Sequence, residues 1–376
     1  MEVYLDNAAT TRVCTEAADI AYKVMTECYG NPSSTHTKGR EAKTYLDAAR
    51  AQIAKALGCA VTEVYFTSCG SESDVWAITK GAESMSRRGK HIISSAVEHD
   101  AVRKTLADLE SRGYEVTYLK PEQDGSISVQ AVKTALRSDT VLVTLMMVNN
   151  ETGGVTDIAG IAKMLKAEGS KALLHTDAVQ GFMKLPFSAK KLGADMISIS
   201  GHKIHAPKGI GALYIKTGVK IKPLIHGGAQ ESGLRAGTEA MPQIAAFGKA
   251  AEIAFAGMKE NCEKIAKLRE SAASAICAEM PEAVIIGGGA PHILSVSLPG
   301  WRSEVLMNFL EAKGIFVSRS SACKKGGRSH VLEAMGLSAP IIDGAIRISF
   351  SRMNTQSDVD ALVSALKEAH DTLAHR

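Results

Sequence analysis

The stretch MISISGHKIHAPKGIGALYI (residues 196–215) opens with a short apolar segment that ends at Ser200 and passes directly into Gly201, His202 and Lys203. Other short apolar segments precede it and alternate with segments of helical character. The apolar segments lie at residues 63–68, 91–95, 115–119, 141–148 and 172–176, and helices are expected at 71–87, after His99 and at 158–169. Short strands that alternate with helices predict a mostly parallel sheet covered on both faces, and thus a large α/β domain.

A second unit follows this α/β pattern. Residues 243–280 are expected to be helical throughout and to lead into it. Its expected strands lie at 292–298, 315–318 and 345–350, and its expected helices lie near 302–313 and 355–374. We therefore divide the chain into an N-terminal segment (1–14), which is free to pack with either domain, a large α/β domain (15–256) and a small α+β domain (257–376).

Composition excludes several classes of protein. The net charge is +4, and no basic stripe is interleaved with aromatics, so direct nucleic-acid binding is not indicated. A length of 376 residues is enough for two domains. The apolar run at 141–148 is too short to cross a bilayer, and the first ten residues lack the pattern of a signal peptide. Seven cysteines without C-x-x-C spacing indicate a reducing cytoplasm rather than zinc or disulfides.

Polar residues directly follow several expected strands, which is where ligands bind in parallel α/β sheets. Gly70 and Ser71 stand where a strand passes into a helix, and backbone N–H groups at a helix start form a cup for phosphate. Alternatively, Ser71 only caps the helix. His99 follows the next strand, where it either stacks on an aromatic ligand and shuttles protons or has a structural role.

Two further strand ends carry groups suited to a ring ligand. Asn150 and Glu151 follow the most apolar strand, where a carboxamide can orient a ligand, unless the segment is only a turn held by asparagine. Asp177 ends another strand, and Gln180 lies three residues later. A buried carboxylate needs a partner such as a protonated pyridine nitrogen, although Asp177 is equally suited to cap a helix.

Lys203 completes this set of strand-end residues. A partly desolvated lysine has a lowered pKa and acts as an amine nucleophile. A lysine, an acid for a ring nitrogen and a phosphate cup together indicate a Schiff base with pyridoxal 5'-phosphate. Lys208 lies in a Pro-Lys-Gly turn and is expected to face solvent, so Lys203 is the better candidate.

At this point the residues match a known family. The chain resembles the cysteine desulfurases of the class V aminotransferase group, which are fold-type I pyridoxal phosphate enzymes. The likeness runs nearly end to end, through YLDNAATT (4–11), GNPSSTHTKGR (30–40), FTSCGSES (66–73), EHDAV (98–102), VNNETGGV (148–155), HTDAVQ (175–180), SGHKIHAPKGIGALY (200–214), HGGAQESGLRAGT (226–238), PHILSVS (291–297), SSACKKGG (320–327), SHVLEAMG (329–336) and AIRISF (345–350). The resemblance implies a seven-stranded sheet in the large domain and a homodimer.

The resemblance also implies roles for individual residues. Lys203 would form the Schiff base, His99 would stack on the ring and take part in catalysis, and the other cofactor contacts would come from Gly70, Ser71, Asn150, Asp177, Gln180, Ser200, His202 and, from the neighbouring subunit, Thr238. Asn150 and Arg347 would bind the carboxylate of the substrate. Arg347 fits this role independently, because it interrupts an apolar strand and its planar fork suits a carboxylate; the alternative is a surface ion pair.

Cys323 separates desulfurases from ordinary transaminases. The family reaction converts L-cysteine to L-alanine and leaves a persulfide on Cys323. This cysteine lies among small and basic residues, of which Lys324, Lys325 and Arg328 would favour the thiolate. The sulfur would pass to an acceptor protein. The segment from Cys323 to Ser329 is shorter than in members that supply general iron–sulfur scaffolds, so a cluster scaffold and a tRNA-thiolating enzyme both stay open as acceptors.

Other features depart from the family or leave alternatives. Cys69, Ser71, Ala240 and Ser295 are unusual for their positions, and Cys14 is an additional thiol near the N-terminal motif, without an assigned role. The main alternative is another pyridoxal phosphate lyase that cleaves C–S or C–Se bonds, acting on selenocysteine, cysteine sulfinate or cysteine itself by β-elimination. A non-catalytic scaffold is a further alternative. No metal is expected at the site.

Overall fold

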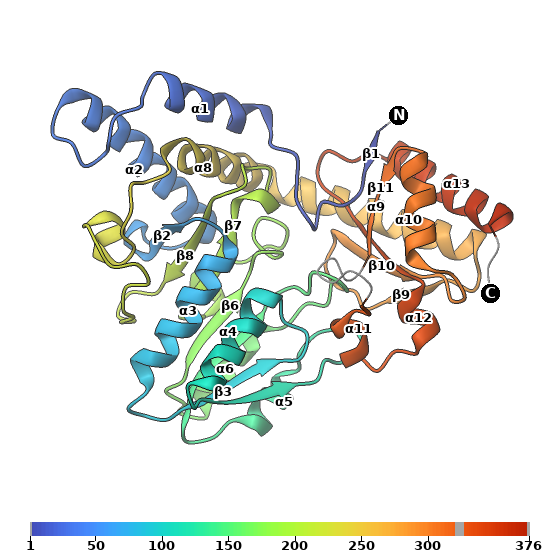
Figure 1. The fold of residues 1–376 in the computed structure, drawn as a ribbon, viewed down its shortest axis with the longest axis horizontal. Helices are drawn as coiled ribbons and strands as arrows, with labels where there is room; N and C mark the ends of the chain where they lie inside the picture. The colour runs from blue at the N-terminus through green and yellow to red at the C-terminus, as the bar shows by residue number, and fades with distance from the viewer. Residues whose placement is uncertain (1, 320–326, 374–376) are drawn as a thin grey trace.

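The computed structural model describes residues 2–319 and 327–373. A seven-stranded sheet forms the centre of the larger unit (Figure 1). Its strands lie in the order β2 (Val64–Thr67), β8 (Gly211–Ile215), β7 (Met196–Ser200), β6 (Leu173–Asp177), β5 (Thr140–Met146), β3 (His91–Ser95) and β4 (Glu115–Leu119). The five strands from β7 to β4 are parallel, whereas β8 runs antiparallel to both β7 and β2. The mostly parallel seven-stranded sheet is therefore confirmed.

Helices cover both faces of this sheet, as the apolar strands require. Every residue of β3, β5 and β7 is buried. One face packs with α3 (Gly70–Met85) and α4 (Asp100–Ser111), which contribute Trp76 and Leu106 to a shared core. The core on the other face includes residues of α1 (Thr15–Thr26), α2 (Thr37–Leu57), α5 (Val129–Ala135), α6 (Ile158–Ala167), α7 (Ala189–Leu192) and α8 (Met241–Ala256).

The C-terminal part builds a second, antiparallel sheet with its own core. Its order is β12 (Ser318–Arg319), β13 (Ala345–Ser349), β10 (Ile293–Ser297) and β9 (Val284–Ile286). The core includes residues of α9 (Met258–Glu279), α10 (Ser303–Ala312) and α13 (Gln356–Thr372). Two short helices, α11 (His330–Ala334) and α12 (Ala339–Asp343), pack beside β9. This is the expected α+β arrangement, and the division between residues 256 and 257 stays a prediction.

The N-terminal segment packs with the second unit. Strand β1 (Val3–Tyr4) pairs in parallel with β11 (Ile315–Phe316), and Val3 and Leu5 belong to the core of the small unit. In Figure 1 the blue N-terminal strand accordingly lies among the orange and red elements. The chain then turns along the boundary between the two sheets, where Asp6 forms a bridge with Ser349. Residues 8 and 9 thereby reach the end of β7.

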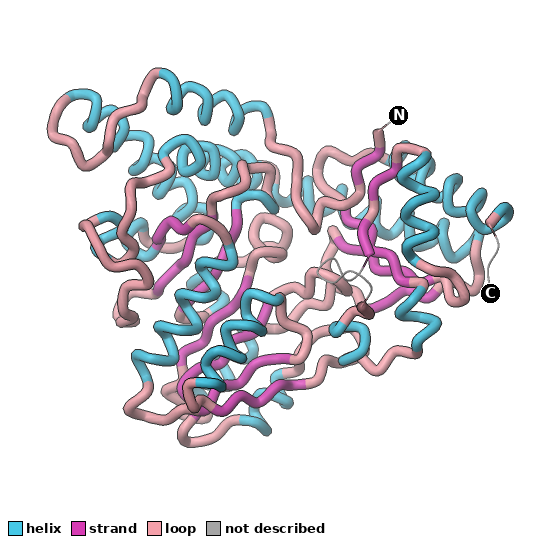
Figure 2. The backbone as a smooth tube through the Cα atoms, in the orientation of Figure 1, coloured by secondary structure: helices cyan, strands magenta, loops and turns pink. Residues whose placement is uncertain are grey.

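The structure corrects some of the expected elements (Figure 2). Residues 243–280 are not one helix, because α8 ends before Gly257, whose φ of −97° and ψ of 12° are not helical, and α9 starts after it. Glycine adopts non-helical backbone angles at little cost, so the helix can end at this residue. The expected strand at 315–318 is divided between two sheets, as β11 and β12. Strands β8 and β9 were not located in advance. No helix in the described part of the chain is long and apolar enough to span a membrane.

Candidate active site

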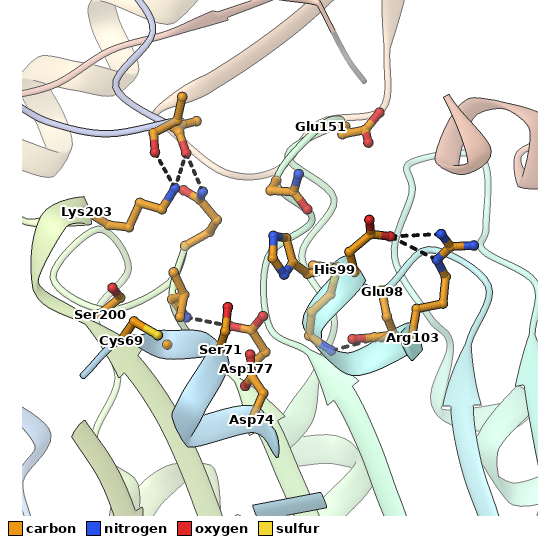
Figure 3. A pocket seen from close by; sticks show the side chains of 18 of the residues that line it. Cys69, Ser71, Asp74, Glu98, His99, Arg103, Glu151, Asp177, Ser200 and Lys203 are labelled. Carbon is orange, nitrogen blue, oxygen red and sulfur yellow. Dashed lines mark hydrogen bonds and ion pairs between the residues drawn. The ribbon is translucent and has the colours of Figure 1, made fainter. Parts of the chain in front are cut away.

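A cavity of about 390 Å³ opens where the carboxyl ends of β6 and β7 face the small sheet. Its lining includes nearly every described residue that the sequence marked as a site residue, and Figure 3 shows several of these side chains pointing into it. These lining residues are Gly70, Ser71, His99, Asn150, Asp177, Gln180, Ser200, His202, Lys203 and Arg347. The carboxyl ends of the parallel strands thus gather residues that are far apart in the sequence, as expected for this class of sheet.

Lys203 ends the short 3₁₀ helix η2 (Gly201–Lys203), which directly follows β7. Its Nζ atom donates hydrogen bonds to the carbonyl oxygens of Ala8, at 2.6 Å, and Ala9, at 2.7 Å. Burial and the charge of Arg347 lower the pKa of Lys203 to about 8. The N-terminal segment therefore holds an amine that loses its proton more readily than an exposed lysine. Lys208 is exposed, as expected.

Asp177 is the last residue of β6, where it lies beside Met146 of β5. Its Oδ1 accepts a hydrogen bond from the backbone N–H of Val179 at 2.9 Å. Burial raises the pKa of Asp177, and the positive charge of Lys203 opposes this shift. A buried carboxylate with one backbone donor retains capacity for a cationic partner. The amide of Gln180 donates to the oxygen of Ala8 at 2.8 Å, next to Lys203.

His99 precedes α4 and caps its first turn. Its Nδ1 accepts a hydrogen bond from the N–H of Ala101 at 3.1 Å, which fixes the ring and places the proton of a neutral imidazole on Nε2. The structural role considered for His99 is therefore present. The same bond holds the imidazole against the cavity, so it leaves the stacking role open.

The first turn of α3 forms a cup of hydrogen-bond donors. The helix begins at Gly70 after Cys69, so Ser71 is not its cap and lies within the first turn. Ser200 adds a buried hydroxyl that has no partner among the described residues. A Cβ atom at Gly70 would lie 2.7 Å from Cγ2 of Val179, so the close approach here requires glycine. A helix start with free backbone N–H groups and an unused hydroxyl fits the phosphate of pyridoxal phosphate.

His202 lies beside this cup with an uncharged ring. Burial lowers the pKa of His202 to about 4, and the charge of Lys203 adds to this effect. The Nδ1 atom is 3.2 Å from Oγ1 of Thr10. A neutral imidazole can donate one hydrogen bond, so its contribution to anion binding is as a donor and not as a charge.

Arg347 crosses the boundary between the two sheets from the interior strand β13. Nη1 donates to the backbone oxygen of Asn150 at 2.7 Å, and Nη2 donates to Oδ1 of Asp6 at 2.9 Å. The side chain is buried, which excludes the surface ion pair considered from the sequence. Its Nε atom is buried without a partner in the described structure. These bonds use two of the five N–H donors of the guanidinium, so Arg347 retains donors and a positive charge for a further anionic group at the cavity.

The two asparagines in the turn after β5 have different positions, and each fits one of the two roles considered from the sequence. Oδ1 of Asn149 accepts from the N–H groups of Glu151 and Thr152, each at 2.9 Å, so this side chain holds the turn. Asn150 lines the cavity instead. Glu151 is buried and accepts a hydrogen bond from the hydroxyl of Ser329. Burial raises the pKa of Glu151 to about 7.

Some lining residues were missed from the sequence, chiefly Asp74, Glu98, Arg103 and His330. Arg328, which the sequence marked as a basic neighbour of Cys323, also lines the cavity. Asp74 lies on the buried face of α3, so an acid within an apolar helix face was the available signal. Glu98 directly precedes His99, so its position next to a candidate site residue was the available signal. Arg103 and His330 give no local pattern that separates them from surface residues.

One described residue among the expected site residues is not brought to the cavity. Thr238 is exposed and does not line it, and its proposed role depends on a second subunit. Cys323 lies outside the described residues. Among the other thiols, Cys69 lines the cavity, whereas Cys14 is buried at the start of α1. The six described cysteines are all free.

Comparisons with known proteins agree with this arrangement. The profile described as aminotransferase class-V matches residues 3–362. The chain is 43% identical over 371 residues to a protein named cysteine desulfurase IscS from Methanosarcina thermophila, with 97% of this chain and 91% of that protein covered. It is similar to the structure of a NifS-like protein, with a TM-score of 0.94, 39% identity and coverage of 99% and 100% of the two chains. It is also similar to SspA in complex with cysteine, with a TM-score of 0.83, 34% identity and coverage of 94% and 99%.

Proposed function

The chain belongs to the class-V aminotransferases, and we propose that it is a pyridoxal-phosphate-dependent cysteine desulfurase that converts L-cysteine to L-alanine and passes the sulfur to Cys323. The observation that carries this function is the convergence of Lys203, Asp177 and Arg347 on one cavity, in a chain that is similar over its whole length to cysteine desulfurases. The cavity offers an amine, a buried acid and a carboxylate-binding group together.

The fit to pyridoxal phosphate rests on separate parts of the cavity. Ser71, Ser200, His202 and the first turn of α3 would hold the phosphate, and Asp177 would pair with the ring nitrogen. When bound, the cofactor supplies an aldehyde that condenses with amines and a ring that withdraws electrons from the substrate Cα. His99 would lie against the ring and Gln180 near its oxygen substituent.

The residues of the chain would then divide the work as follows. Arg347, with Asn150, binds the substrate carboxylate and so orients the amino acid. Lys203 releases and accepts protons at Nζ, which its lowered pKa allows near neutral pH. The Cys323 thiolate attacks the substrate sulfur, so that an S–S bond forms as the sulfur–Cβ bond breaks, and protonation of Cβ gives alanine. The basic residues close to Cys323 in the sequence would favour its thiolate.

The assembly and partners are part of the same proposal. Thr238 would reach the phosphate of a second subunit in a homodimer, which accounts for its exposed position outside the cavity of its own chain. The persulfide would be passed to an acceptor protein, either a cluster scaffold or a tRNA-thiolating enzyme. Free cysteines support a reducing, cytoplasmic location.

Product analysis tests the reaction. The purified protein, incubated with L-cysteine and a thiol reductant, is expected to release alanine and sulfide in equal amounts, with a persulfide on Cys323 when the reductant is omitted. Pyruvate and ammonia instead would show β-elimination, and full desulfurase activity in Cys323→Ala would exclude the persulfide route.

Borohydride reduction tests the cofactor assignment independently. The reduced coenzyme is expected on the peptide that contains Lys203, and Lys208→Ala is the matched control because that lysine is exposed in the same loop. Coenzyme attached to another side chain, or to none, would refute the assignment.

A further inference from the structure

Three carboxyl groups lie beneath the cavity, and the proposed reaction uses only one of them. Asp74 comes from α3, Glu98 from the turn before α4, and Asp177 from the end of β6. All three line the cavity, and none is more than 6% exposed. In Figure 3 Asp74 and Asp177 lie at the bottom of the view, lower than Lys203, and Glu98 lies to their right, beside Arg103. Three negative charges in so small a buried volume would repel one another strongly.

Glu98 has hydrogen bonds on one oxygen only. Its Oε1 accepts from the hydroxyl of Ser95 at 2.6 Å and from the N–H of Met146 at 3.1 Å. Its Oε2 is buried without a partner, and no lysine or arginine forms an ion pair with it in the described structure. Burial raises the pKa of Glu98 to about 8, and the charge of Asp177 acts in the same direction. Oε1 is therefore the oxygen that accepts hydrogen bonds, and Oε2 is the oxygen left available for a proton.

Asp74 also has no cationic partner. The imidazole of His175 lies beside it, with 3.7 Å between Nε2 and Oδ1 of Asp74. Both ring nitrogens of His175 already share hydrogen bonds with hydroxyls, those of Thr144 at 2.8 Å and Ser198 at 2.9 Å. Burial lowers the pKa of His175 to about 3, so the ring is neutral and cannot balance a carboxylate. Burial, and then the charge of Asp177, raise the pKa of Asp74 well above its ordinary value.

Asp177 is the carboxyl group that faces positive charge. Burial raises the pKa of Asp177, but the charge of Lys203 opposes this shift, and Val179 donates a backbone hydrogen bond to the carboxylate. Among three mutually repelling acids, the single negative charge therefore belongs on Asp177.

We propose that Glu98 and Asp74 are positioning residues that stay protonated, so that the floor of the cavity carries one negative charge, located on Asp177. The inference rests on the proposed function only in the identity of the partner, a protonated ring nitrogen with one positive charge. A single carboxylate matches that charge, whereas two or three would bind additional protons or cations. Neutral acids also fill the floor with groups that can donate hydrogen bonds.

The stability of the full-length protein as a function of pH tests Glu98. Its pKa is higher in the folded protein than in the unfolded chain, so the wild type loses stability as pH rises from its ordinary value of 4.5 towards 8. Glu98→Gln mimics the neutral acid and removes this loss. The melting temperature of Glu98→Gln is therefore expected to rise relative to wild type as pH increases, with the cofactor bound and after its removal. Glu122→Gln, at an exposed position, is the matched control.

Infrared spectroscopy gives a readout that a merely structural role would not change. A protonated carboxyl group has a C=O stretch separate from that of a carboxylate, so one such band is expected to vanish at neutral pH in Glu98→Gln and another in Asp74→Asn. Unchanged bands in both variants, or a Glu98→Gln protein that loses stability relative to wild type as pH rises, would overturn the proposal. Neither measurement requires cysteine turnover, so failure of the proposed function would be seen separately.

Discussion

Replacement of Arg347 by methionine should reveal a binding site for the substrate carboxylate. Each charge-assisted hydrogen bond contributes about 1.5–3 kcal/mol, so a two-bond contact with a carboxylate contributes about 3–6 kcal/mol. At about 1.4 kcal/mol for each factor of ten, kcat/KM for cysteine is expected to fall by roughly 10²- to 10⁴-fold. Folding should persist, because Asp6, which loses its cation, is 22% exposed and remains in contact with water.

The assay compares cysteine with cysteamine, which lacks the carboxylate. Alanine formation gives kcat/KM for cysteine, and the change in cofactor absorbance gives the affinity for both compounds. Arg347→Met is expected to lose affinity for cysteine but not for cysteamine. Arg347→Lys keeps the charge without the planar fork, so its affinity for cysteine should lie between those of the wild type and Arg347→Met. Arg12→Met, at an exposed position, is the control. Equal losses for cysteine and cysteamine, or a kcat/KM within about threefold of wild type, would refute the reasoning.

Further outcomes follow from the burial of charged groups. Only the uncharged amine condenses with an aldehyde, and the pKa of Lys203 is lowered to about 8. The rate of cofactor uptake by the apoprotein, measured by absorbance, should therefore rise through about pH 8 and then level off. A rate that keeps rising up to the ordinary lysine pKa of 10.5 would contradict this. Ser329→Ala should lower the free energy of unfolding by about 1–2 kcal/mol in urea titrations. The loss should be larger above pH 7 than below it, because the hydrogen bond from Ser329 favours the charged form of Glu151. The same loss of stability on both sides of pH 7 would contradict this prediction. Arg50→Met should cost about 3 kcal/mol in guanidinium unfolding, since it strands the buried carboxylate of Glu231, and an unchanged midpoint would exclude a stabilising pair.

The fold was largely predictable because its strands carry strong local signals. The strands that end at Ser95, Asp177 and Ser200 are buried on both faces, and short clusters of isoleucine, leucine and methionine marked them in the sequence. The strand at 211–215 was missed because it follows the Pro-Lys-Gly turn after Lys203 without an intervening helix, which departs from the alternating pattern. The break at Gly257 was missed because a single glycine does not end a helix by itself.

The cavity was predictable to the extent that its residues follow strands. Lys203 and Asp177 were found in this way, and the resemblance to a family supplied Arg347. The sequence could not show that the carbonyl oxygens of Ala8 and Ala9 hold Lys203, because these partners are about 195 residues apart and no local pattern links them. The protonated state of Glu98 was equally hidden, since it depends on burial and on the absence of a cation in the described surroundings.

The pairing of β1 with β11 has a consequence for the biosynthesis of the protein. All seven strands of the large sheet have been made once residue 215 leaves the ribosome. By contrast, Val3 can pair in a strand only after Ile315 has been made, and Asp6 can form its ion pair only after Arg347 has been made. Residues 3–9 are thus made before the large sheet but are fixed after it. Because this segment also holds Lys203, the nascent chain can complete its sheet while the reactive amine gains its final surroundings only after Arg347 has been made.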